Sequence, residues 1–251
     1  MFEALDSLWA GLVEDFYTCF IEKNRWKYLV TGLENTLLIT FFALLIGVVI
    51  GIVISIVRST YAKNYQEMKP GFGKKVMAVA NWFCGVYLTV IRGTPVVVQL
   101  MIIYYCVFVS SSNGILIGAV SFGINSGAYV AEIFRSGIMS IDNGQFEAGR
   151  SLGFNYVQTL RYIVLPQAFK NVLPSLANEF IVLLKETSVA GYVMVVDLTR
   201  AGNLIRNNTM DAISPIVTVA VTYLVLVILM TFLLSKVEKR LNKSAKSRKS
   251  H

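Results

Sequence analysis

The chain has 251 residues, of which 55% are hydrophobic and 15% are charged, and its formal net charge at pH 7 is +8. Soluble domains carry about 25% charged residues, so this composition argues against a soluble enzyme. The basic residues cluster beside long apolar runs, a placement typical of membrane orientation rather than of nucleic-acid binding. The sequence therefore predicts an all-α, polytopic membrane protein.

Five apolar segments are long enough to cross a bilayer, whose core of about 30 Å takes roughly 20 residues of helix. They are residues 29–57, 77–109, 115–138, 172–194 and 213–234. The second is too long for one straight helix, and Gly93 and Pro95 interrupt it. We prefer a surface helix over residues 74–87 followed by a shorter span, and one continuous span is the alternative.

These spans divide the chain into an amino-terminal segment (1–28), a membrane domain (29–235) with a loop at residues 139–171, and a basic tail (236–251). Most of the 23 Lys and Arg residues lie between the first two spans, in that loop and in the tail. The positive-inside rule then predicts an extracellular amino terminus and a cytoplasmic carboxyl terminus. We expect the tail to be a disordered arm near anionic lipid.

Arg92 stands directly before Gly93-Thr94-Pro95, at the break in the second span. Proline has no N–H, so a break there frees backbone polar groups for a ligand. A guanidinium presents a planar fork that matches a carboxylate. We hypothesise that Arg92 binds the α-carboxylate of an amino acid, and the alternative is a side chain that extends to the cytoplasmic headgroups.

In the third span, Asn125, Tyr129 and Glu132 lie four and seven residues apart and so share a helical face. Side chains on this face could line a pathway. Glu132 also precedes Arg135 by three residues, which favours an intrahelical ion pair for this carboxylate.

The loop between the third and fourth spans contains a spaced motif, formed by Glu147-Ala148-Gly149, Gly153, Ile163 and Leu165-Pro166. It predicts a helix, a turn and a second helix, because glycine permits a sharp turn and proline suits the beginning of a segment. A short helix pair that protrudes from a membrane domain fits a groove on another protein.

In the fourth span, Glu179 and Glu186 are seven residues apart, which places them within about 20° of one helical face. Carboxylates at membrane depth are costly unless a cation or a cavity accompanies them. Lys185 points about 100° away from Glu186 on a helix, so it is no obvious partner for both. A cationic substrate group is one candidate, and a structural pair with Lys185 or a neighbouring subunit is the alternative.

The loop motif resembles the signature of ABC importer permeases: Glu-Ala-Ala, three residues, Gly, nine residues, Ile, one residue, Leu-Pro. The chain departs from it at Gly149, where the pattern has Ala. Residues 92–95 with Gln99, residues 125–129 and residues 184–188 resemble the polar amino acid uptake subfamily of the histidine/glutamine type. The resemblance covers the chain from about Gly32 to Leu241.

The resemblance implies a type I ABC importer permease-like fold in a bacterial cell membrane. Its implied partners are a cytoplasmic ATPase subunit, an extracellular solute-binding protein and a second permease subunit, identical or homologous. ATP hydrolysis would then belong to the separate subunit, and no cofactor or metal is expected in this chain. The implied coupling residues are Glu147, Ala148, Gly149, Gly153, Ile163, Leu165 and Pro166.

The candidate substrate-binding residues are Arg92, Thr94, Gln99, Asn125, Tyr129, Glu179 and Glu186. The resembling family often has an amide at the position of Glu179, so the acid here favours a basic amino acid as substrate. Glutamine, cystine or another polar amino acid is the alternative. An ion-coupled secondary transporter, which would usually have more spans and an internal repeat, and a non-transporting scaffold are alternatives of other classes.

Overall fold

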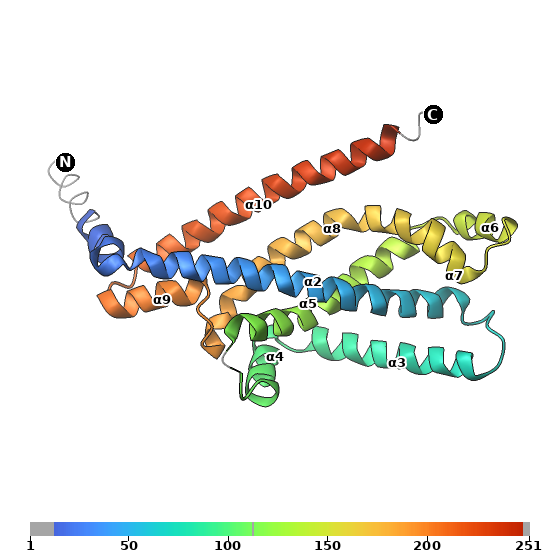
Figure 1. The fold of residues 1–251 in the computed structure, drawn as a ribbon, viewed down its shortest axis with the longest axis horizontal. Helices are drawn as coiled ribbons and strands as arrows, with labels where there is room; N and C mark the ends of the chain where they lie inside the picture. Colours follow the sequence, from blue (N-terminus) through green and yellow to red (C-terminus); the bar gives the residue numbers. More distant parts are fainter. Residues whose placement is uncertain (1–12, 112, 248–251) are drawn as a thin grey trace.

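The computed structural model describes residues 13–111 and 113–247, with side chains up to residue 237. Over these residues the secondary structure is helical, without strands, which confirms the predicted all-α class. The long helices are α2 (Trp26–Asn64), α3 (Phe72–Gly93), α5 (Gly114–Met139), α8 (Leu165–Glu186) and α10 (Ser214–Ser247). They follow the order of the five predicted spans and run roughly along one direction (Figure 1).

Among these long helices, α2, α3, α5 and α10 are apolar enough to cross a membrane by length and composition. α8 is more polar, because Lys170, Glu179, Lys185 and Glu186 interrupt its apolar sequence. Hydrocarbon tolerates such groups where they face protein or a water-filled cavity. Glu179 meets this condition, since it is buried in the bundle.

The most extensive contact in the bundle joins α2 to α5, where small residues let the two backbones approach closely. A Cβ atom added at Gly47 would lie 3.1 Å from the Ser126 Cβ, and one added at Gly51 would lie 2.5 Å from the Val130 Cγ1. Close approach through small residues is the usual way in which membrane helices pack. Beside this contact, α2, α4, α5 and α8 form one fully buried cluster through Ile39, Leu100, Phe122 and Leu183.

The second predicted span is divided at Thr94–Pro95, where the sequence places a break. α3 ends at Gly93, and a shorter helix, α4 (Val96–Ile102), follows and continues as a π-helical turn (Ile103–Val107). Pro95 is the N-cap of α4.

A separate surface helix over residues 74–87 is not formed, so that expectation is wrong. These residues belong to α3, one continuous helix that lies alongside α2 (Figure 1). Arg58 of α2 donates to Asn81 Oδ1 at 2.9 Å, and the Tyr87 hydroxyl donates to a backbone carbonyl of α5. Periodicity within α3 cannot reveal these bonds, because their partners lie on other helices.

The fourth span begins and ends earlier than the predicted range of 172–194. α8 starts at Leu165, because Pro166 in its first turn has the fixed φ of a helix start. It ends at Glu186, and a 3₁₀ helix (Thr187–Val193) follows.

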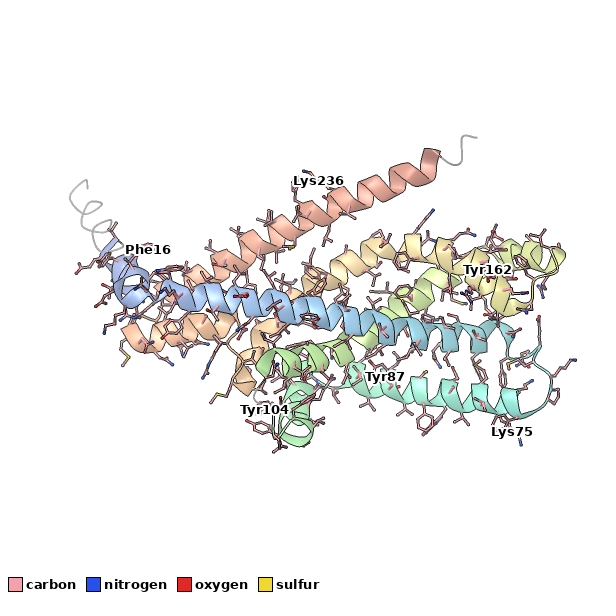
Figure 2. All side chains as sticks on the ribbon, viewed as in Figure 1. Phe16, Lys75, Tyr87, Tyr104, Tyr162 and Lys236 are labelled. Atoms are coloured by element: carbon pink, nitrogen blue, oxygen red, sulfur yellow. The ribbon has the colours of Figure 1, made fainter. Side chains whose placement is uncertain are left out.

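The remaining helices lie at opposite ends of the bundle. α9 (Leu198–Thr209) lies at the end where α2 and α10 begin, whereas α6 (Asn143–Ser151) and α7 (Tyr156–Thr159) lie at the end where α2 turns into α3 (Figure 1). Figure 2 shows Lys75 and Tyr162 at the end that contains α6, and Phe16 at the end that contains α9.

The two terminal segments differ from the simplest expectation. Residues 236–247 continue α10 as helix, so the expected disordered arm is wrong for these residues, and residues 248–251 lie outside the described range. Lys, Arg, Leu and Ala are strong helix formers, which explains the continuation. At the other terminus, residues 1–12 lie outside the described range, and a π-helical turn (Tyr17–Ile21) and a 3₁₀ turn (Glu22–Asn24) precede α2.

Candidate functional site

A network of buried amides braces the break between α3 and α4. The Gln99 Nε2 atom donates to the carbonyl oxygen of Ile91 at 2.7 Å, and to the carbonyl and hydroxyl oxygens of Thr94 at 3.0 and 2.8 Å. The Asn125 Nδ2 atom of α5 donates to Gln99 Oε1 at 3.0 Å. Pro95 removes a helical hydrogen bond here, and Gln99 satisfies the carbonyl groups that this leaves free. The structure thus brings Thr94, Gln99 and Asn125 together.

Arg92 lies at the end of α3 between an aromatic ring and a carboxylate. Its guanidinium carbon is 5.8 Å from the Tyr129 ring centroid, and its Nη1 atom is 3.8 Å from Glu132 Oε1. The other oxygen of Glu132 accepts from Arg135 at 3.0 and 3.2 Å, so the predicted intrahelical ion pair is formed. Because Glu132 is shared by two guanidinium groups, its single charge only partly neutralises Arg92.

A groove of about 810 Å³ runs along α3 beside Arg92. Its lining includes Arg58, Trp82, Thr89, Arg92 and Glu132, and the Arg92 side chain is 47% exposed. Small-molecule sites in proteins usually have volumes of about 300–1,000 Å³. The groove is therefore large enough for an amino acid, and two guanidinium groups face it.

Glu179 of α8 lies in the interior with a single hydroxyl partner. Its side chain is buried and accepts a hydrogen bond from the Ser126 Oγ atom of α5 at 2.7 Å. Glu186 is half-buried, whereas Lys185 is exposed. Among the side chains that the structure describes, neither carboxylate forms an ion pair within 4.0 Å. The alternative of a pair with Lys185 is therefore not realised within this chain.

Ser126 is the polar group of this region that the sequence did not single out. It directly follows Asn125, and successive helical residues point about 100° apart, so the two side chains reach different neighbours. Asn125 contacts Gln99, and Ser126 contacts Glu179. The run Asn125-Ser126-Gly127 contained the signal, but only knowledge of where α8 lies gives Ser126 a partner.

The loop motif forms the expected helix, turn and helix. Asp142 caps α6 by accepting from the Gly144 N–H at 2.6 Å, and Asn155 and Gln158 form a reciprocal capping box at the start of α7. Gly153 has a φ of +81°, a conformation that favours glycine. The turn that Gly153 was expected to allow is therefore present.

Within the motif, Gly149 has a packing role that explains its departure from the family pattern. It is buried, and a Cβ atom added there would lie 2.5 Å from the Thr159 Oγ1 atom and 2.6 Å from its Cγ2 atom. An alanine would therefore clash with α7. Glu147 and Ala148, in contrast, are exposed on α6 and available to another protein.

Of the remaining motif residues, Leu165 packs against the buried cluster beneath the loop, and Ile163 is half-buried. Pro166 is exposed in the first turn of α8. The motif thus combines exposed positions on α6 with positions that hold the loop on the bundle.

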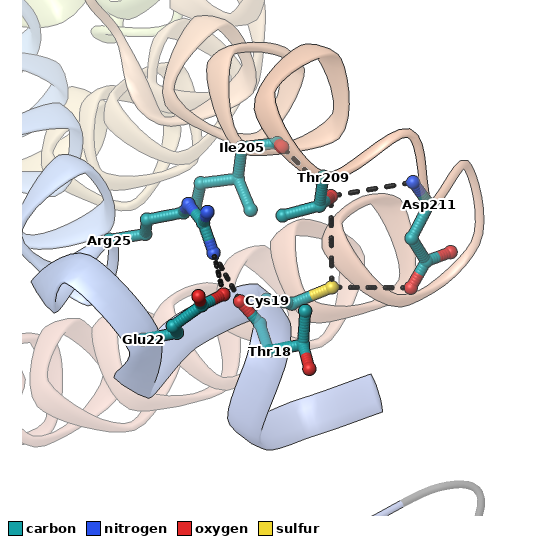
Figure 3. A network of polar contacts seen from close by, with 7 residues as sticks. All are labelled: Thr18, Cys19, Glu22, Arg25, Ile205, Thr209 and Asp211. Carbon is teal, nitrogen blue, oxygen red and sulfur yellow. Dashed lines mark hydrogen bonds and ion pairs between the residues drawn. The ribbon is translucent and has the colours of Figure 1, made fainter. Parts of the chain in front are cut away.

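At the opposite end of the bundle, the chain before α2 is tied to the turn between α9 and α10 (Figure 3). The Cys19 thiol donates to Asp211 Oδ2 at 3.3 Å, and Arg25 pairs with Glu22 at 3.2 Å and donates to the Thr18 carbonyl oxygen. Hydrogen bonds from Ser214 and the Ile213 N–H lower the pKa of Asp211 to about 2. Burial raises the pKa of the Cys19 thiol. Cys19 is buried, and its thiol has polar partners in Thr209 and Asp211.

Comparisons with known proteins agree with this geometry. The family described as "Binding-protein-dependent transport system inner membrane component" matches residues 71–243. The glutamine transport system permease protein GlnP of Escherichia coli strain K12 is 38% identical over 167 residues, which cover 65% of this chain and 76% of that protein. A putative GlnP of Rickettsia typhi is 37% identical over 166 residues, with the same coverage of both chains.

Solved structures show the same arrangement of helices. A crystal structure of an amino acid ABC transporter with histidines matches 88% of this chain and 98% of its own chain, with 36% identity and a TM-score of 0.73. An inward-facing structure of the MetNI methionine ABC transporter matches 85% and 96%, with a TM-score of 0.72. At 21% identity, the second likeness concerns the fold alone.

Proposed function

Because this chain belongs to the family of binding-protein-dependent transport system inner membrane components, we propose how its residues bind and move the transported solute. The chain is the membrane-spanning permease subunit of an ATP-driven amino acid importer of the bacterial inner membrane. A separate subunit hydrolyses ATP, and a binding protein and a second permease subunit complete such systems. An ion-coupled transporter and a non-transporting scaffold are thereby excluded.

Our proposal is that the transported solute is a basic amino acid, whose cationic group lies beside Glu179 and Glu186. The supporting observation is Glu179, a buried carboxylate with one hydroxyl partner and no ion pair among the described side chains. An isolated buried charge is costly, so a cationic ligand would stabilise it. A hydrogen bond from Ser126 fixes the carboxylate in place before the ligand arrives.

The α-carboxylate of the same solute is assigned to Arg92. Its side chain lines the groove and is about half exposed, and Glu132 neutralises it only in part. A guanidinium group can donate two parallel hydrogen bonds to a carboxylate. Thr94, Gln99 and Asn125 would support this site by holding the chain break in shape, and Tyr129 would support it by contact with the guanidinium group.

Glutamine is the second candidate, and the curated relatives favour it. Two relatives at 37% and 38% identity are named as glutamine permeases. A glutamine side chain would be a hydrogen-bond partner of Glu179 without a charge, whereas a basic amino acid adds the missing cation. The two candidate substrates thus differ in whether the ligand brings a positive charge to Glu179.

The orientation is also proposed, with the end that contains α9 outside and the end that contains α6 in the cytoplasm. Lys63, Lys69 and Lys75 belong to the same end as α6, in or near the turn between α2 and α3. Cytoplasmic loops carry the excess of Lys and Arg, which supports this sidedness. Exposed Glu147 and Ala148 would then face the ATPase subunit.

The test is transport and ATP hydrolysis by the permease assembled with its ATPase subunit and binding protein in lipid vesicles. Arginine, lysine, histidine, glutamine and cystine would be compared. For a basic substrate, Glu179→Gln should lower its transport at least about tenfold, because hydrogen bonds to charged groups contribute about 1.5–3 kcal/mol. Glu34→Gln, the same change at an exposed position of α2, is the matched control.

Stimulation by a basic amino acid that Glu179→Gln abolishes would support the assignment. Stimulation by glutamine alone, unchanged in Glu179→Gln, would reject the basic substrate and keep the importer. Equal effects of Glu179→Gln and Glu34→Gln would remove Glu179 from the site.

A further inference from the structure

The carboxyl-terminal end of α2, which is its inner end in the proposed orientation, contacts α6, although the two helices are far apart in sequence. The amino-terminal end is called the outer end. The Lys63 Nζ atom lies 4.4 Å from the centroid of the Phe146 ring and donates to Asn143 Oδ1 at 3.2 Å. Just beyond α2, Glu67 pairs with Arg150 at 3.7 Å. α6 is therefore held by α2, besides its covalent connections to α5 and α7.

Phe146 of α6 contacts both Lys63 of α2 and a residue of α7. The Phe146 ring is buried and stacks on the Tyr156 ring of α7, with centroids 5.8 Å apart and planes inclined by 16°. Lys63 approaches Phe146 as a cation over an aromatic face, a contact worth about 0.5–1 kcal/mol at exposed sites. A displacement of α6 would consequently move the partners of Lys63.

The middle of α2 lies directly beside the candidate substrate region. Gly47 is packed so closely on Ser126 that an added Cβ atom would lie 3.1 Å from both its Cβ and its Oγ atoms. Ser126 in turn holds Glu179. A shift of α2 along or about its axis therefore acts on the residue that positions Glu179.

The outer end of α2 is fastened to the chain that leads into α9. Asn35 Nδ2 donates to the Val196 carbonyl oxygen at 2.8 Å, and the Leu198 N–H donates to the Thr36 hydroxyl at 3.1 Å. A Cβ atom added at Gly32 would lie 2.7 Å from a backbone oxygen and 2.8 Å from the Ala201 Cβ atom. This end is therefore joined by two hydrogen bonds and a close packing contact.

Between its two ends, α2 is one unbroken helix of 39 residues without proline. At 1.5 Å per residue it is about 58 Å long. Sharp bends in helices arise almost always at proline, at glycine or serine pairs or at π-bulges. α2 has neither proline nor a π-turn, and its glycines Gly47 and Gly51 are packed against α5 without interrupting the helix, so its ends are expected to move together.

We propose that α2 moves as one rigid helix and thereby transmits the displacement of α6 to the outer helix α9. Lys63 is its positioning residue at the inner end, because it joins α2 to α6 through Phe146 and Asn143. The proposal concerns the transmission of movement and is independent of which amino acid is transported.

A label on the outer helix tests this directly. Asn208 of α9 is exposed, and Asn208→Cys, in a background with Cys84→Ser and Cys106→Ser, can react with a membrane-impermeant maleimide. The reaction rate would be measured with and without ATP in the transporter assembled with its ATPase subunit. Lys63→Met removes the cation, and Lys69→Met, an equal change at an exposed position nearby, is the matched control.

We expect ATP to change the labelling rate equally in the parent and in Lys69→Met. In Lys63→Met this change should be about fivefold smaller, because the variant loses a cation–aromatic contact and a hydrogen bond. Lys63→Arg should retain the change, because it keeps both the cation and a donor. Unstimulated ATP hydrolysis should persist in Lys63→Met, which shows that the complex is assembled.

Equal responses in Lys63→Met and Lys69→Met would overturn the proposal, since movement would then pass through α5 and α8 alone. An outer helix that does not respond to ATP in the parent would overturn it as well.

Discussion

The loop that contains α6 and α7 and the candidate substrate region within the bundle are built in opposite ways. The loop takes its motif from about 20 consecutive residues, and its helices are capped by neighbours in sequence, such as Asp142 and Asn155. The substrate region joins side chains from α3, α4, α5 and α8. Local sequence therefore defines the first region, and helix packing defines the second.

The two regions also differ in how they satisfy their polar groups. Water can reach the exposed loop, so a lost hydrogen bond there is replaced at little cost. Gln99, Asn125 and Glu179 are buried, and a partner lost there leaves an unsatisfied group. Substitutions should accordingly be more costly in the bundle than in the loop, except where the loop is tightly packed.

The largest effect is expected for Gln99→Leu, which tests the claim that the bundle depends on buried polar partners. The change leaves the Ile91 carbonyl and the Asn125 amide without Gln99, and we expect a loss of about 3 kcal/mol in the free energy of unfolding. Denaturant unfolding of the purified protein measures it. Gln66→Leu at an exposed position is the control, and equal stability of the two variants would contradict the bracing role.

Gly149→Ala tests a position of the loop that is as tightly packed as the bundle, where α6 meets Thr159 of α7. The new Cβ atom would overlap the Thr159 side chain, and overpacking of this kind costs about 1–3 kcal/mol. We expect weaker binding of the ATPase subunit, by about tenfold, measured by titration in detergent. Thr159→Ala should restore binding in the double variant, because it removes both atoms that clash. Full binding by Gly149→Ala alone would show that the loop adapts.

A smaller effect is expected for Arg92→Lys in the groove. The charge remains but the planar fork is lost, so the Michaelis constant for uptake should rise by up to about tenfold, with little change in the maximal rate. Arg58→Lys is the matched control, because it lies in the same groove and donates to Asn81. An equal rise in both variants would point to the general charge of the groove instead of a site at Arg92.

The smallest effect concerns Asp211, at the end of the molecule that contains α9 (Figure 3). Its pKa falls from the ordinary value of 3.8 to about 2, so its ionised form is favoured in the folded protein. Because the pKa of Asp211 is lower in the folded than in the unfolded protein, its ionisation stabilises the fold at pH values above 3.8. This contribution is lost as the pH falls from 3.8 toward 2. Thermal unfolding temperatures of the parent and Asp211→Asn should therefore converge over this range. A difference in unfolding temperature that stays constant over this pH range would show that Asp211 stabilises the fold by something other than its charge.

Hydropathy and spacing were sufficient for the class and the order of the long helices, because both depend on residues that are close in sequence. They also placed the break at Gly93 and Pro95 and the turn at Gly153, where one residue decides the backbone conformation. They were insufficient for residues 74–87, because the bonds that hold α3 alongside α2 come from other helices. The basic composition of the tail predicts a disordered arm, but residues 236–247 continue α10, because their Lys, Arg, Leu and Ala residues are strong helix formers.

The sequence by itself determined that this chain is a polytopic membrane protein with a protruding helix pair, and it marked Arg92, Glu179 and Glu186 as ionisable residues at membrane depth, whereas Gln99 entered through the family resemblance. Only the tertiary structure decided that Gln99 and Asn125 satisfy each other, that Ser126 holds Glu179, and that Lys63 joins α2 to α6. The physical reason is that a hydrogen bond or an ion pair needs two groups within a few ångströms, and helix packing alone brings residues 53 or 80 positions apart to that distance.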